Sequence, residues 1–435
     1  MALELEDFRP PPYRMTPLSW AAYGGHEAVV KMLLERDDVE PDTVDRFGET
    51  PLFKAAEEGH EGVVKMLLER GDVNPNTANR RGETPIGIAI WAGNEGVVNM
   101  LLERNDINMD PTRGRAGGTP LLKAASNGRE GIVKMLLERN DANPNTVDDE
   151  YGFTPLFEAA CANHEGVVKI LLERGDVNPN IASVNGETPL FGAAECGNEG
   201  VLKMLLERKD VNTELADNYG RTPLRIAVSK GHEGVVKMLL GREDVNPNTA
   251  SGYGETPLSI AARKGCEGVV KILLERNDIN ADTADQYGQT PLLMAAWEGH
   301  EGVVKILLER GDVNLNAADD RGETILFGAA SWGREGIVKI LLEQVGVNSD
   351  IANLAGETAL SRAQKSGHHA IVKLLSEHRN MIPPLDGDEF SALSSPEGSD
   401  LDKLPSKTIS LDFKAKAQHV RPSLGNPSDQ PQTSC

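Results

Sequence analysis

The sequence predicts an all-α solenoid of eleven helix-turn-helix units joined by hairpin-like loops. A threonine that usually precedes Pro-Leu recurs with eight spacings of 34 residues and two of 35. An Ala-Ala pair and a later Val-Val-Lys-x-Leu-Leu run recur within most of these periods. A fixed period of this length indicates units that bury their apolar faces only against neighbouring units. The recurring threonines are Thr16, Thr50, Thr84, Thr119, Thr154, Thr188, Thr222, Thr256, Thr290, Thr324 and Thr358.

The first helix of each unit is predicted to begin at this threonine, as residues 50–59 illustrate. The Thr50 hydroxyl can cap the helix, and Pro51 suits the first helical position, where no backbone N–H is needed. The small Ala55 and Ala56 allow close stacking of neighbouring units. Gly59 can adopt the left-handed conformation that ends the helix.

The second helix and the loop follow in residues 60–83. Val63, Val64, Leu67 and Leu68 have the spacing of one buried helical face. Residues 71–83 are rich in Gly, Asn, Asp and Pro, which favour turns. We therefore expect a long hairpin-like loop that leads to the next Thr-Pro. Neither helix is long enough to be stable alone, so packing between units must supply the stability.

The pattern Thr-Pro-Leu-x-x-Ala-Ala-x-x-Gly-His, followed by Val-Val-Lys-x-Leu-Leu and Asp-Val-Asn, resembles the ankyrin repeat. The resemblance extends over residues 16–381, and the sequence of the repeats is similar to that of arrays common in filamentous fungi. Two features differ from the family pattern. The usual histidine after Thr-Pro-Leu is absent from every copy, and the period is one residue longer, so we expect the extra residue in the loop.

Two segments flank the array. Residues 1–15 form a Pro-containing N-terminal lead that could fold back as a cap. Residues 382–435 lose the period, are rich in Pro and Ser, and are expected to be disordered because they cannot bury a core. Two interpretations of this tail stay open: a regulatory segment with kinase sites near Ser395 and Ser423, or a solvated terminus.

Composition excludes several classes of protein. The net charge of -22 argues against binding to nucleic acid or to an anionic membrane. No run of 18 apolar residues exists, and the acidic N-terminus lacks an apolar signal segment. The cysteines have no metal-ligand spacing, and Cys161 and Cys196, one unit apart, are expected to stay reduced. We therefore predict a soluble, monomeric protein of the cytoplasm or nucleus.

No catalytic, metal or cofactor site is predicted. An active site needs one constellation of groups in a single cavity, whereas nearly all carboxylates here recur at fixed positions of the repeat. Most units carry a histidine, such as His60, at the start of the second helix. Adjacent units are too far apart to share a metal ion, so we expect these side chains to bond to nearby backbone instead.

Aromatic residues are concentrated where the resemblance implies partner binding. In ankyrin arrays, partners bind the concave side, which consists of loop tips and the solvent-facing end of the first helix. Although aromatic residues make up only 4% of the chain, all six tyrosines and three of the four tryptophans fall at these positions. Five tyrosines lie three residues before a recurring threonine, namely Tyr13, Tyr151, Tyr219, Tyr253 and Tyr287. Tyr and Trp are enriched in binding hot spots, although tyrosines repeated at loop tips could also pack on one another.

Units seven and eight add basic residues to this face. The candidate partner-binding residues are Tyr219, Arg221, Arg225, Lys230, Tyr253, Arg263, Lys264, Tyr287, Trp297 and Trp332. Basic residues beside exposed tryptophans suit an acidic or extended peptide segment of a protein partner. Random surface drift among duplicated copies is the alternative explanation for the basic residues.

The function predicted from these features is a non-catalytic protein–protein interaction scaffold with its partner on the concave face. The alternative hypothesis is an accessory subunit of a separate enzyme or signalling effector. The resemblance implies a fungal metabolic or secondary-metabolite pathway for this alternative, because some related fungal arrays are encoded beside such genes.

Overall fold

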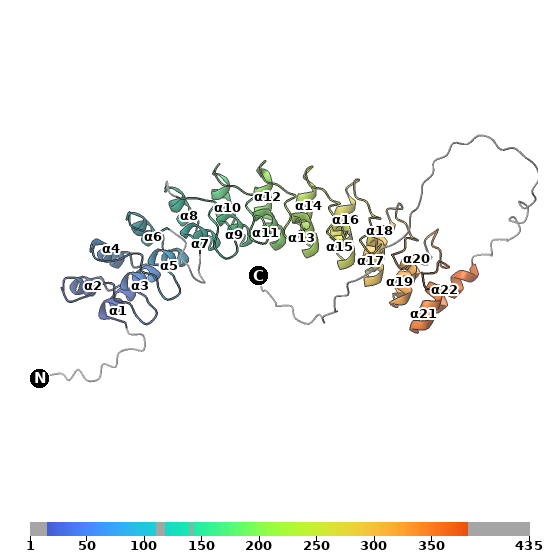
Figure 1. Cartoon of the computed structure of the whole chain (residues 1–435), viewed down its shortest axis with the longest axis horizontal. Helices are drawn as coiled ribbons and strands as arrows, with labels where there is room; N and C mark the ends of the chain where they lie inside the picture. Colours follow the sequence, from blue (N-terminus) through green and yellow to red (C-terminus); the bar gives the residue numbers. More distant parts are fainter. Residues whose placement is uncertain (1–14, 110–117, 140–141, 382–435) are drawn as a thin grey trace, which may run out of the picture. The chain divides into compact units, whose positions relative to one another are not determined.

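The computed structural model describes residues 15–109, 118–139 and 142–381, which form twenty-two helices in eleven pairs (Figure 1). This confirms the predicted all-α solenoid. The first helices of the pairs are α1 (Pro17–Tyr23), α3 (Pro51–Glu58), α5 (Pro85–Ala92), α7 (Pro120–Ser126), α9 (Pro155–Cys161), α11 (Pro189–Cys196), α13 (Pro223–Lys230), α15 (Pro257–Lys264), α17 (Pro291–Glu298), α19 (Ile325–Ser331) and α21 (Ala359–Ser366). The second helices are α2 (Glu27–Leu34), α4 (Glu61–Glu69), α6 (Glu95–Leu102), α8 (Glu130–Leu137), α10 (Glu165–Leu172), α12 (Glu199–Glu207), α14 (Glu233–Leu240), α16 (Glu267–Leu274), α18 (Glu301–Leu308), α20 (Glu335–Leu342) and α22 (His369–Met381).

The first helices begin and end as the sequence predicts. The Thr50 hydroxyl accepts a hydrogen bond from the backbone N–H of Phe53 at 3.1 Å, and the corresponding threonine does the same in every other unit. Gly59 ends α3 with φ of 78°, in the left-handed region that glycine enters without strain. These local signals fix where each first helix starts and stops.

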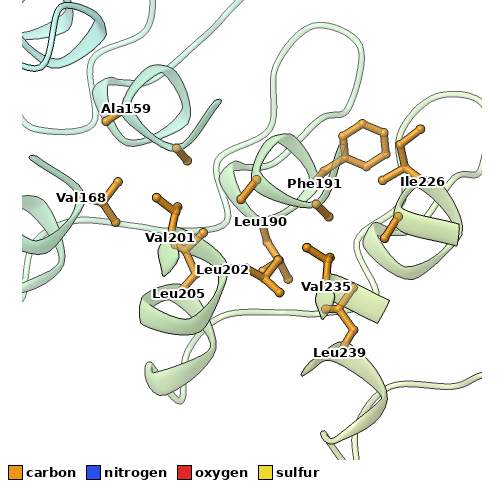
Figure 2. Close-up of a cluster of buried hydrophobic side chains, with 14 of the residues drawn as sticks. Ala159, Val168, Leu190, Phe191, Val201, Leu202, Leu205, Ile226, Val235 and Leu239 are labelled. Carbon is orange, nitrogen blue, oxygen red and sulfur yellow. The ribbon is translucent and has the colours of Figure 1, made fainter. Parts of the chain in front are cut away.

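First helices stack on first helices, and second helices on second helices, along the array. The core between them consists of the alanine pairs of the first helices and the Val-Val and Leu positions of the second helices. Figure 2 shows one such cluster, in which Leu190 of α11 lies near Val201, Leu202 and Leu205 of α12. Fully burying one such valine or leucine contributes about 1.5–3 kcal/mol, so the interfaces between units supply the stability that single helices lack.

In most units, the side chain that precedes the second helix links adjacent units. His60 Nε2 lies 2.9 Å from the backbone oxygen of Tyr23 in the preceding unit. His164, His232, His300 and His368 make the equivalent contact. This confirms the prediction that these histidines bond to backbone. Asn94 makes a similar bond, donating to the carbonyl oxygen of Ala56.

The glycine after the first residue of the second helix makes room for a carboxylate. A side chain at Gly62 would overlap the carboxylate of Glu27 from the preceding unit, and the same relation holds at Gly96 with Glu61. Each carboxylate therefore lies beside the N-terminus of the next unit's second helix, where the helix dipole favours negative charge. The repeated Glu-Gly pair thus serves packing between units.

Most of the arginine–aspartate pairs form a third link between units. The Arg208 guanidinium bonds to Asp210 at 2.5 Å and donates to the carbonyl oxygen of Leu172 in the preceding unit at 3.0 Å. Hydrogen bonding to its arginine lowers the pKa of the aspartate below the usual 3.8 in each of these pairs. The pairs are Arg36–Asp38, Arg70–Asp72, Arg104–Asp106, Arg174–Asp176, Arg208–Asp210, Arg242–Asp244, Arg276–Asp278 and Arg310–Asp312.

Thermal stability is expected to rise and then fall as the pH decreases from neutrality. Burial raises the pKa of Glu57, Glu158, Glu187 and Glu323 in the folded state. These groups take up protons in the folded state first, so stability increases as the pH falls toward their raised pKa values. Relief of repulsion within a chain of net charge -22 acts in the same direction.

Below the usual aspartate pKa of 3.8, the sign reverses because the aspartates of the arginine pairs have lowered folded-state pKa values. Their stabilisation is present above 3.8 and is lost as the pH falls through the lower folded-state values. Melting temperature, measured by circular dichroism between pH 3 and 8, should pass through a maximum on the acidic side of neutrality. A monotonic fall from pH 7 to pH 4 would contradict this expectation.

Several predictions concern residues outside the described part of the chain. The lead over residues 1–14 and the tail over residues 382–435 lie there, as does Tyr13. Within the described residues, Cys161 and Cys196 form no disulfide, in agreement with the expectation that they stay reduced. Hydrogen bonding to Cys196, together with burial, raises the pKa of the Cys161 thiol.

Candidate functional site

The long loops between units are hairpins, here called fingers, and one polar side chain shapes each of them. Asp217 Oδ1 accepts hydrogen bonds from the backbone N–H groups of Tyr219 at 3.0 Å and Arg221 at 2.7 Å. Such side-chain-to-backbone bonds fix a tight turn. The residues that do this in the other described fingers are Asp45, Asn79, Asp148, Ser183, Ser251, Asp285, Asp319 and Asn353.

Backbone hydrogen bonds connect one finger to the next. The N–H of Gln286 donates to the carbonyl oxygen of Tyr253 at 2.9 Å, and the N–H of Asp320 donates to that of Tyr287 at 3.0 Å. Equivalent bonds join Arg80 to Phe47 and Val184 to Tyr151. In these four fingers the tip residue joins the next finger through its backbone oxygen, which leaves its side chain available for other contacts.

The tyrosine rings of three consecutive fingers are open to solvent. The exposed fractions are 76% for Tyr219, 65% for Tyr253 and 57% for Tyr287. Arg221 lies over the Tyr219 ring at 5.3 Å from its centroid. Among the described residues, no ring-to-ring contact joins these three tyrosines. Their row of exposed rings, together with the ends of the first helices, is here called the finger face.

The tryptophans of the first helices do not all behave alike. Trp91 is 61% exposed and Trp332 is 65% exposed, at the ends of α5 and α19. Trp297, at the end of α17, is only partly exposed, and its indole lies against Gly328 of the next unit. The Trp297 Nε1 atom is buried without a hydrogen-bond partner. Part of the Trp297 ring thus packs within the array, and its contact with a partner stays a prediction.

The basic residues of units seven and eight are mostly neutralised by their own chain. Arg221 pairs with Asp217 at 2.6 Å, Lys230 with Glu195 at 3.3 Å and Arg263 with Glu255 at 2.8 Å. Lys264 Nζ donates to the carbonyl oxygen of Ser229 at 2.5 Å. These side chains lie on the finger face, but an acidic partner would compete with carboxylates that are already in place.

Arg225 is buried, which corrects its predicted place on the accessible surface. Its exposed fraction is 5%, and it occupies the third position of α13, where six of the other ten units have Phe or Leu. The guanidinium donates from Nη1 to the carbonyl oxygen of Gly220 at 2.7 Å, while Nε has no partner. Burial lowers the pKa of Arg225. The side chain thus packs the base of its own finger.

Sequence reasoning missed a cavity of about 250 Å³ that spans α5, α7 and α9. Its lining includes Gly87 and Trp91 of α5, Lys123 of α7 and Glu158 of α9. Burial lowers the pKa of Lys123, although the negative charge of Glu83 acts in the opposite direction. Burial raises the pKa of Glu158. The signal in the sequence was Gly87, which leaves empty a position that holds Phe or Leu in most units.

The described residues hold no cluster of three or more His, Cys, Asp or Glu side chains placed to bind a metal ion. Among the same residues, no helix combines the length and the apolar character needed to cross a membrane.

Comparison with known proteins agrees with this architecture. The family "Ankyrin repeats (3 copies)" matches residues 18–113, 105–181, 176–251, 243–319 and 312–384, so the chain belongs to the ankyrin repeat family. Ankyrin repeats are generally protein–protein interaction modules. Among solved structures, the ankyrin repeat protein EF0377 is 28% identical in sequence. That match covers 43% of this chain and 96% of EF0377, with a TM-score of 0.41. No curated protein matches the chain.

Proposed function

We propose that this protein is a non-catalytic scaffold that binds a protein partner on its finger face, the side that corresponds to the concave face of ankyrin arrays. The single observation that carries the proposal is the row of exposed rings at Tyr219, Tyr253 and Tyr287. Large aromatic side chains bury much area at low entropic cost when they bind, which is why they dominate interface hot spots.

The partner segment is proposed to be extended, because the three rings belong to consecutive fingers, and a backbone bond ties the Tyr253 finger to the Tyr287 finger. An extended segment that crosses the fingers would meet one ring per unit. Since Arg221, Lys230 and Arg263 are already paired, acidic groups on the partner would tune the orientation of the segment more than its affinity. The scaffold is proposed to act as a monomer in the cytoplasm or nucleus.

Replacing the three tyrosines with serine (Tyr219→Ser, Tyr253→Ser and Tyr287→Ser) is expected to weaken partner binding at least about tenfold, which corresponds to about 1.4 kcal/mol. The partner is first identified by affinity purification with the full chain, and its dissociation constant is then measured by biolayer interferometry. The tyrosine backbones and the finger hydrogen bonds are unchanged, so far-UV circular dichroism should match that of the parent protein.

The matched control changes exposed residues of the second helices in the same three units: Lys237→Ser, Lys271→Ser and Lys305→Ser. This variant should bind the partner as the parent does. The assignment of the finger face fails if the tyrosine variant binds normally, or if the lysine variant loses the partner instead.

A further inference from the structure

We propose that the cavity beside Trp91 binds the side chain of an arginine from the protein partner. This proposal rests on the proposed function, because it places a specific contact of the same partner elsewhere on the same face. The cavity of about 250 Å³ lies between three consecutive first helices, α5, α7 and α9. The proposal depends on its open floor, its aromatic wall and its unpaired carboxylate.

Gly87 opens the floor of the cavity. It stands at the third position of α5, directly after Thr-Pro-Ile, where α3, α9 and α11 carry phenylalanine. A methyl group at Gly87 would already lie 3.3 Å from Thr84 Oγ1 and 3.4 Å from Lys123 Nζ. A phenylalanine at this position would therefore project into the space that the cavity leaves free.

Trp91 forms an aromatic wall that stays accessible. The corresponding tryptophan of α17, Trp297, lies against Gly328 of the following unit, where no side chain obstructs it. The position equivalent to Gly328 beside Trp91 is Lys123, which lines the same cavity. Because Lys123 fills that position, the Trp91 indole remains 61% exposed.

The cavity has an excess of negative charge and a carboxylate without a counter-ion. Glu83 accepts a hydrogen bond from Asn79 Nδ2 at 2.8 Å. Glu158 is half-buried and has neither a hydrogen bond nor an ion pair within the described residues. Among the described lining residues, two are acidic, Glu83 and Glu158, and one is basic, Lys123. A half-buried, unpaired carboxylate favours a cationic ligand, because the ligand offsets the cost of its desolvation.

Arginine fits this combination better than lysine. Its planar guanidinium can stack on an indole, and it can donate two hydrogen bonds to one carboxylate. It is also more weakly hydrated than an ammonium group, so it enters a partly buried cavity at lower cost. Asn127 donates through Nδ2 to the carbonyl oxygen of Lys123 at 2.8 Å, which leaves its amide oxygen as an additional acceptor. The guanidinium would stack one face on Trp91, and its N–H groups would donate hydrogen bonds to Glu158 and Asn127.

The test is a titration of the full-length protein with N-acetyl-arginine amide, observed through the indole N–H signals of the tryptophans by NMR. A Trp91→Phe variant assigns the Trp91 signal. That signal should shift in a saturable way with N-acetyl-arginine amide. The dissociation constant obtained from this shift should be at least about tenfold higher for N-acetyl-citrulline amide, which has the same shape but no charge, as expected for about 1.4 kcal/mol of charge-dependent binding.

Glu158→Gln should weaken the binding of N-acetyl-arginine amide at least about tenfold. The variant should fold, since it removes a half-buried charge and therefore should not lower the melting temperature. Glu298→Gln, an exposed glutamate at the end of α17 on the same face, is the matched control and should leave binding unchanged.

Equal shifts with the arginine and citrulline amides would overturn the proposal, as would unchanged binding by Glu158→Gln or an unmoved Trp91 signal at millimolar arginine amide. Any of these results, combined with tyrosine-dependent capture of the partner, would remove the arginine site and leave the proposed function standing. Conversely, the arginine site would be supported and the proposed role of the tyrosines rejected if the protein bound N-acetyl-arginine amide but the tyrosine substitutions left partner binding unchanged.

Discussion

The Leu205→Ala substitution is expected to lower the free energy of unfolding by about 2–5 kcal/mol. Leu205 of α12 is fully buried and belongs to the cluster of Val201, Leu202 and Leu190 in the sixth of eleven units (Figure 2). Its truncation removes apolar contacts and leaves a cavity that the closely stacked helices can fill only in part. Urea unfolding followed by circular dichroism at 222 nm measures the loss.

The position of this leucine makes the expected result more specific than a simple loss of stability. Units of a repeat array are stabilised mainly by their nearest neighbours. A cavity in the middle of the array therefore weakens the coupling between its two halves. Unfolding of Leu205→Ala should broaden or divide into two transitions, and limited trypsin digestion should yield two protected fragments.

Leu375→Ala is the matched control, because Leu375 has the equivalent place in α22 of the last unit and is 2% exposed. The chemical change is identical, but only one neighbouring unit depends on it. This variant should lose only the terminal helices α21 and α22, with one main transition left nearly unchanged. Indistinguishable unfolding curves for the two variants would show that the array unfolds as a single cooperative unit.

The fold was predictable because its signals are local and repeated. Thr50, Pro51 and Gly59 specify where a first helix begins and ends by capping and by backbone conformation alone. These capping and helix-ending signals are weak in a single unit, but they recur in eleven units, and the repetition makes the prediction specific. The repeated glycine after the glutamate, such as Gly62, could not be explained from its own unit. It is required because a side chain there would overlap the carboxylate of Glu27 in another unit.

The candidate site was predictable only in part. Tyr219, Tyr253 and Tyr287 lie at finger tips, where a side chain has few neighbours, so position alone indicated their exposure. Arg225 could not be placed in this way, because its exposure depends on how its long side chain turns toward the finger at Gly220. The pairing of Lys230 could not be predicted either, since its acceptor, Glu195, belongs to the preceding unit.

A pairing rule between consecutive first helices explains the remaining differences. The seventh residue of one first helix lies against the fourth residue of the next. Cys161 lies against Gly192, and Trp297 lies against Gly328, in both cases where a side chain at the glycine would overlap it. Trp91 instead faces Lys123 and remains exposed. The exposure of such a tryptophan is therefore decided by a residue that lies one unit later in the sequence.

This rule predicts that Gly328→Ala will displace the Trp297 ring. A methyl group at position 328 would overlap the indole nitrogen of Trp297, and the flat ring cannot yield locally as a flexible chain end can. Overpacking of this kind costs about 1–3 kcal/mol, against a gain of roughly 0.5–1 kcal/mol from replacing a helical glycine with alanine. We therefore expect a net loss of stability, and a tryptophan emission spectrum shifted to longer wavelength as the buried indole enters water.

Gly192→Ala provides the matched control, because it makes the same change at the same helical position beside a different side chain. There the new methyl group meets the Cys161 thiol, which can rotate about one bond, so the gain in helix propensity should be largely retained. The emission spectrum should stay that of the parent, since no tryptophan borders this position. If Gly328→Ala also kept the parent spectrum and stability, the position of the Trp297 ring would not depend on the absence of a side chain at Gly328. The rule that relates one unit's tryptophan to the next unit's fourth helical residue would then be wrong.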